Sequence, residues 1–134
     1  MNRQRVAGAI LTVGGLFIML ASLPHAFLGW PALRDALQGQ TSHEVLNTAA
    51  IGWLFGSFAM ATLGFVALVS ASQLRRGIPA ARTQALVVGA GYILFGAWAL
   101  WYDEGNPHFI AFMVLGAAVA LGAWFFTSRA SSEA

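Results

Sequence analysis

Residues 45–74 read VLNTAAIGWLFGSFAMATLGFVALVSASQL, thirty consecutive positions without a charged side chain. A helix of that length extends about 45 Å, whereas the hydrocarbon core of a bilayer is about 30 Å thick. The stretch therefore predicts a membrane-spanning helix over about residues 45–72. The preceding Thr41-Ser42-His43-Glu44 has the form of a capping box, with the Thr41 hydroxyl at the N-cap and the Glu44 carboxylate three residues later.

Small residues recur along one side of this helix. Gly52, Gly56, Met60 and Gly64 stand four residues apart, and the Gly52-x-x-x-Gly56 spacing allows another helix backbone to approach closely. We therefore expect Gly52, Gly56 and Gly64 to form a helix-packing interface, either between copies of the chain or inside one bundle.

The composition indicates that most of the chain is surrounded by membrane lipid. The 134 residues are 58% hydrophobic and 9% charged, with a mean hydropathy of +0.70, whereas a soluble domain carries about 25% charged residues. The sequence pI is 9.9, but the net charge is only +2. Because the arginines lie in short loops, where membrane topology explains them, no nucleic-acid partner is predicted.

Three further apolar stretches predict spans over about residues 6–23, 84–102 and 109–127. The expected fold is an all-α polytopic membrane protein, a single transmembrane domain built as an antiparallel four-helix bundle. In the first outer loop, Pro31 suits the first position of a helix, and Leu33 and Leu37 share one helical face. We therefore expect a short amphipathic helix over about residues 31–38, lying at the membrane surface and anchored by Trp30.

Two stretches of the chain resemble small four-helix bacterial membrane proteins. They are His25-Ala-Phe-Leu-Gly-Trp-Pro-Ala-Leu33 and Gly52-Trp-Leu-Phe-Gly56, the latter followed by Met60 and Leu63-Gly64. The resemblance covers most of the chain and implies no particular function.

The arginines predict the orientation in a bacterial inner membrane. One side of the predicted bundle carries Arg3, Arg5, Arg75, Arg76, Arg82 and Arg129, and the other side carries Arg34 alone. By the positive-inside rule, both termini are expected to be cytoplasmic. Of the acidic residues, Glu133 alone then lies on the cytoplasmic side.

Several classes of function are excluded by missing residue types. The chain has no cysteine, which excludes disulfides, thiolate metal sites and iron–sulfur clusters. It also has no lysine, which excludes Schiff-base chemistry. The central parts of the predicted spans contain no Asp, Glu, Arg or His, so the usual marks of ion-coupled transport are missing.

The histidines fall on the predicted outer (periplasmic) side, at the same level as several carboxylates. One interpretation is a ligand or metal site for zinc, copper(II) or iron, drawn from His25, His43, Glu44, Asp103 and His108. A second is a haem with a histidine as axial ligand. A third is a catalytic acid–base site of His25 and His108 with Asp103 and Glu104. The alternative to all three is a set of hydrated loop residues, because no two histidines have a local ligand spacing.

Two functions follow as hypotheses. The first is a non-enzymatic inner-membrane protein that acts through helix packing, as a homo-oligomer or as an accessory subunit of a membrane complex, with no cofactor expected. The second is a membrane enzyme, or a protein that binds a ligand, a metal ion or haem, with its site at the outer end of the bundle.

Overall fold

The computed structural model describes residues 3–126, and all regular secondary structure in this range is helical. In chain order the elements are α1 (Arg3–Pro24), the π-helical turn η1 (His25–Gly29), α2 (Trp30–Leu37), α3 (His43–Arg75), α4 (Ala80–Tyr102), the 3-10 turn η2 (Pro107–Phe109) and α5 (Ile110–Phe125). The predicted fourth span ends at Thr127, which lies outside the described residues, as do Arg129 and Glu133.

Within the described range, four helical segments are long and apolar enough to cross a membrane, which confirms the expected number of candidate spans. They are Gln4–Leu37, His43–Arg75, Ala80–Tyr102 and Pro107–Phe125. The first two, with 34 and 33 residues, are each about 50 Å long at 1.5 Å per residue. The last two, with 23 and 19 residues, are only about 35 and 28 Å long.

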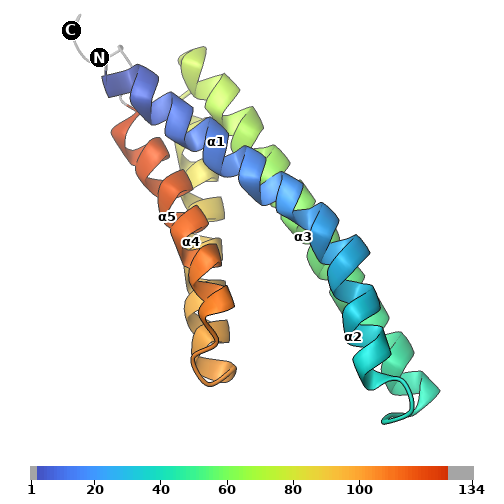
Figure 1. Ribbon diagram of the computed structural model, residues 1–134. Helices are drawn as coiled ribbons and strands as arrows, with labels where there is room; N and C mark the ends of the chain where they lie inside the picture. Colours follow the sequence, from blue (N-terminus) through green and yellow to red (C-terminus); the bar gives the residue numbers. More distant parts are fainter. Residues whose placement is uncertain (1–2, 127–134) are drawn as a thin grey trace, which may run out of the picture.

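The helices form two pairs that meet at one end and diverge at the other. The first pair is made of α1, η1 and α2 lying along α3, and the second is made of α4 lying along α5 (Figure 1). The pairs meet where α1 contacts α5, toward the start of α1 and the end of α5 (Figure 1). Leu11, Ile18 and Val119 are fully buried and belong to the core of this junction.

Glycine allows the helix backbones to touch inside and between the pairs. A Cβ atom on Gly64 would lie 2.7 Å from the Cα atom of Met19 in α1. A Cβ atom on Gly116 would lie 2.6 Å from the carbonyl oxygen of Gly89, and one on Gly122 would lie 2.8 Å from the backbone nitrogen of Leu11. Because a larger residue has no room at these positions, small residues determine where the helices touch.

The first helical segment continues well beyond residue 23, where the first span is predicted to end. The helix expected near residues 31–38 is present as α2, but it continues directly from α1 through η1 and lies along α3, so it is not a separate surface helix in a loop. Pro24 and Pro31 lack an N–H and would collide with the carbonyl group four residues earlier in an α-helix. The wider π-helical turn between them lets the helix continue. Leu33 and Leu37 still share the less exposed face of α2.

The start of α3 also differs from the prediction. Ser42 is the N-cap, because its hydroxyl oxygen accepts a hydrogen bond from the Val45 N–H at 3.3 Å. Thr41 therefore does not cap the helix, and Glu44 lies one position too early to complete a capping box. The N-cap is therefore one residue later than predicted and the capping box does not form, although a helix does begin at this point of the chain.

Substitution of Gly89 tests the close backbone contact. A Cβ atom at Gly89 would lie 2.7 Å from the Gly116 carbonyl oxygen, whereas one at Gly91 on the same helix would have nothing within 4 Å. We expect Gly89→Ala to lower the free energy of unfolding by about 1–3 kcal/mol through overpacking. The matched control Gly91→Ala should be neutral or slightly stabilising, because alanine favours the helix. Thermal unfolding in mild detergent measures both, and equal midpoints for the two variants would contradict the packing described here.

Candidate functional site

A cavity of about 810 Å³ lies between the two helical pairs where they diverge. Ligand cavities in proteins commonly measure about 300–1,000 Å³. All four long helical segments contribute to its mainly apolar wall, and the lining residues are Ala21, Pro24, His25, Gly29, Gly52, Trp53, Gly56, Met60, Tyr92, Phe95, His108, Phe109, Ala111, Phe112 and Leu115.

His25 is held on the first pair by Trp53 and Ser57 of α3. Its ring stacks on the Trp53 indole, with centroids 4.4 Å apart and planes 9° apart. Its Nδ1 atom lies 2.8 Å from the Ser57 hydroxyl oxygen, and the Trp53 indole N–H donates to the His25 carbonyl oxygen at 2.7 Å. The imidazole therefore has a fixed orientation at the cavity wall.

The π-helical turn and Gly29 make this arrangement fit. His25 is the first residue of η1, and such turns are frequent at functional sites. A Cβ atom on Gly29, the last residue of η1, would lie 2.8 Å from the Trp53 ring. A Cβ atom on Gly56 would lie 3.7 Å from Cε1 of His25. Glycine at position 29 thus leaves space for the stacked rings, whereas a Cβ atom at position 56 would make an ordinary contact with His25.

Tyr92 brings an unpaired polar group to the cavity from α4. Its side chain is 4% exposed, and its hydroxyl is buried without a hydrogen-bond partner among the described residues. Its ring stacks on Phe112 of α5 with centroids 5.8 Å apart. A buried hydroxyl without a partner costs about 1–3 kcal/mol.

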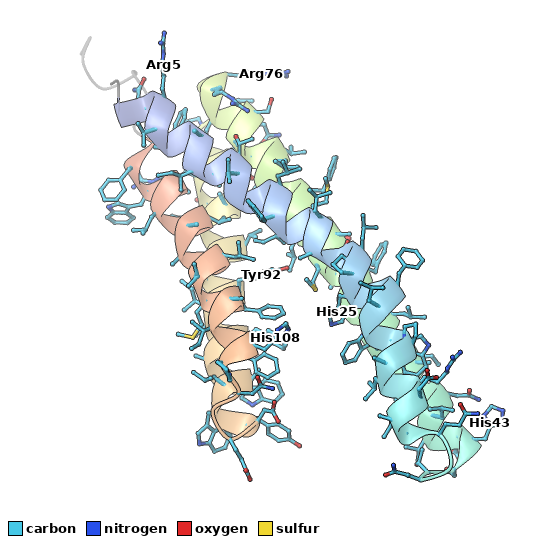
Figure 2. The ribbon with its side chains drawn as sticks, viewed as in Figure 1. Arg5, His25, His43, Arg76, Tyr92 and His108 are labelled. Atoms are coloured by element: carbon cyan, nitrogen blue, oxygen red, sulfur yellow. The ribbon has the colours of Figure 1, made fainter. Side chains whose placement is uncertain are left out.

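His108 stands at the rim of the cavity on the second pair. It belongs to η2, where the Asn106 side chain accepts a hydrogen bond from the His108 backbone N–H at 3.1 Å. The exposed ring makes edge contacts with Phe109 and Phe112, with centroids 5.7 and 5.9 Å away. Figure 2 shows His25 and His108 on the two sides of the gap between the pairs, with Tyr92 deeper between them.

The other predicted site residues lie away from the cavity that His25 and His108 line. His43 lies at the far end of the first pair (Figure 2), with Glu44 next to it in the first turn of α3. Asp103 and Glu104 lie in the exposed turn after α4, where Asp103 accepts a hydrogen bond from the Asn106 side chain at 2.7 Å. None of these four residues lines the cavity.

This arrangement bears on the metal and haem hypotheses. Among residues 3–126, no three His, Asp or Glu side chains come close enough together to hold a metal ion. Two histidines line the cavity, but its lining contains no arginine or lysine to pair with the propionates of a haem. The arrangement is better suited to an uncharged ligand than to either cofactor.

The three glycines of the predicted interface have different surroundings. Gly64 packs within the chain against Met19. Gly52 and Gly56 line the cavity, where a Cβ atom on Gly52 would have nothing within 4 Å. The missing side chains at these two positions widen the cavity.

Sequence analysis assigned neither Trp53 nor Ser57 to a site, and a hydroxyl inside a span usually bonds to a carbonyl of its own helix. That bond is present, from the Ser57 hydroxyl to the Trp53 carbonyl oxygen at 3.2 Å, but Ser57 also contacts His25. A tryptophan inside a span, away from the interfaces that tryptophans prefer, was the available signal.

Substitution of Trp53 tests the support of His25. Trp53→Phe removes the indole N–H that donates to the His25 carbonyl oxygen, so we expect the free energy of unfolding to fall by about 1 kcal/mol. The matched control is Trp101→Phe, because the Trp101 side chain is 78% exposed. Thermal unfolding in mild detergent compares the two, and an equal or larger loss of stability in Trp101→Phe would contradict the assigned contact.

Comparison of the chain with known protein families, with curated proteins and with solved structures finds no match. The function is therefore inferred from the cavity and from the side chains that line it.

Proposed function

We propose that this chain is an integral membrane protein that binds a lipophilic small molecule in the cavity between its two helical pairs. The observation that carries the proposal is a mainly apolar cavity of about 810 Å³ into which few polar groups reach, chiefly His25, Tyr92 and His108. Apolar walls with a small number of placed polar groups are typical of small-molecule sites, in which the walls provide affinity and the polar groups fix the orientation.

The outer surface of the helices supports a membrane setting. Large apolar side chains face away from the protein on both helical pairs. Examples are Phe27, Ile51 and Leu94, whose side chains are 72%, 71% and 69% exposed. In water such a surface would favour aggregation, whereas in lipid it is the expected exterior. A ligand dissolved in the same lipid reaches the cavity without crossing water.

The proposed setting is a bacterial inner membrane, with the four spans arranged as an antiparallel bundle and both termini in the cytoplasm. Arg5 and Arg76 lie at the same end of the molecule, opposite His43 (Figure 2). This placement supports the orientation expected from the positive-inside rule. The cavity then lies in the half of the membrane that faces the periplasm.

Binding is favoured over catalysis by the positions of the carboxylates. An acid–base mechanism needs the two groups within reach of one substrate. Asp103 and Glu104 do not line the cavity that His25 and His108 share. We therefore propose a ligand-binding role and no reaction.

A second candidate function is helix packing, as a homo-oligomer or as an accessory subunit of a membrane complex. The observation in its favour is Gly52, whose open surroundings on α3 leave room for a helix of another chain. In that case the occupant of the cavity is protein and not a small molecule.

Gly56→Leu distinguishes the two candidates, because a leucine side chain there would project beside His25 into the cavity. We expect native mass spectrometry of the wild-type protein, extracted in mild detergent from its own membrane, to show a bound small molecule. Gly56→Leu should lose that mass by occupying the site, while the control Gly91→Leu, where a Cβ atom meets nothing within 4 Å, should keep it.

Two results would overturn the ligand-binding proposal. One is a wild-type protein that carries nothing beyond bulk phospholipid. The other is a smaller oligomer for Gly56→Leu with no change in bound small molecules, which would favour helix packing.

A further inference from the structure

We infer that the cavity selects a lipid-soluble phenol or hydroquinone, whose hydroxyl group donates a hydrogen bond to Nε2 of a neutral His25. This inference rests on the proposed function and specifies the ligand class of the same site. It follows from the hydrogen bonds around His25 and the aromatic character of the walls.

The contacts of Ser57 determine which tautomer His25 adopts. The Ser57 hydroxyl has one proton, and it donates that proton to the Trp53 carbonyl oxygen at 3.2 Å. The same oxygen lies 2.8 Å from Nδ1 of His25. Both hydrogen bonds can exist together only when Ser57 accepts from Nδ1, so we assign the proton to Nδ1, which leaves Nε2 with a free lone pair.

The second ring nitrogen is left open to the cavity. No hydrogen bond to Nε2 occurs within residues 3–126, although His25 lines the cavity. Among the described residues, two buried side-chain polar atoms lack a hydrogen-bond partner: Nε of Arg82 and the Tyr92 hydroxyl oxygen. Nε2 of His25 is not one of them, so it is not a buried atom without a partner. The atom is therefore accessible, and His25 is one of the residues that line the cavity.

A neutral imidazole is the form that suits this wall. No carboxylate lines the cavity to pair with an imidazolium ion, and an unpaired charge in apolar surroundings is strongly unfavourable. Neutral His25 offers a hydrogen-bond acceptor and no donor at Nε2. The ligand must therefore bring the proton, as a hydroxyl group does and a carbonyl or ether oxygen does not.

The remaining walls favour an aromatic ring on that hydroxyl group. Tyr92, Phe95 and Phe112 face the cavity from the second pair, and their rings already stack on or contact each other at 5.3–5.8 Å. Gly52 and Gly56 line the cavity from α3 without side chains of their own. A planar ring is well accommodated next to aromatic side chains where no bulky group intrudes.

Three matched probes test the ligand class on the purified protein in mild detergent: 4-octylphenol, its methyl ether 4-octylanisole, and 4-octylcyclohexanol. The phenol keeps both the ring and the hydroxyl proton, whereas each of the others lacks one of them. Titration calorimetry should give an affinity for the phenol that is about five- to tenfold higher than for the ether, as expected for one hydrogen bond. The cyclohexanol should also bind more weakly than the phenol.

His25→Phe should abolish the preference for the phenol over the ether, because it keeps a ring for stacking on Trp53 and removes Nε2. The matched control His43→Phe changes a histidine that does not line the cavity and should keep the preference. Ser57→Ala should reduce the preference, because His25 is then free to place its proton on Nε2.

Several results would overturn the inference. They are equal wild-type affinities for phenol and ether, an affinity for the cyclohexanol as high as for the phenol, and no binding of the phenol. Equal binding of all three probes would leave the proposed lipophilic site intact and remove only its selectivity. The wild-type comparison needs no variant, so it stays decisive even where a substitution prevents folding.

Discussion

Direct contact between helix backbones at small residues is the constraint on which the rest of the structure depends. The two pairs meet where a Cβ atom on Gly122 would lie 2.8 Å from the Leu11 backbone nitrogen, and one on Gly14 would lie 3.0 Å from a methyl carbon of Val119. Beyond this junction the pairs diverge (Figure 1). In lipid there is little hydrophobic force to close the gap, because lipid tails solvate the helices as well as leucine does. The cavity is therefore a consequence of where the backbone contacts between the two pairs stop.

The polar part of the cavity depends on the irregular turn in the first helical segment. Two prolines would ordinarily interrupt a helix, yet η1 lies between them and the chain continues into α2. Because of this continuation, His25 stands within a long helical segment that packs on α3, where Trp53 and Ser57 hold it. Had the helix ended at Pro24, His25 would lie in a loop exposed to water.

The sequence was sufficient to predict the helical fold and the number of apolar helices. Length and uninterrupted hydrophobicity alone give this result, because a helix satisfies its own backbone hydrogen bonds in lipid. The course of the first segment was not predictable in the same way. Pro24 and Gly29-Trp30-Pro31 have the local signals of a helix end and a turn, and contact with α3 overrides them.

The candidate site was predictable only in part. All three histidines were grouped because each lies near the predicted outer end of a span. His25 and His108 line the same cavity, but the long extension of α2 and α3 places His43 at the far end of the first pair (Figure 2). Tyr92 and Ser57 look like ordinary span residues in the sequence, because an unpaired hydroxyl or a tautomer depends on contacts between helices.

The unequal lengths of the two pairs have a mechanical consequence. A bilayer that matches the second pair when upright, at about 28–35 Å, is too thin for an upright first pair of about 50 Å. The first pair must lean, or project into water at the end that carries Arg34, Asp35 and Glu44. If the first pair leans, its angle to the second pair depends on the thickness of the bilayer, and so does the width of the space between the pairs.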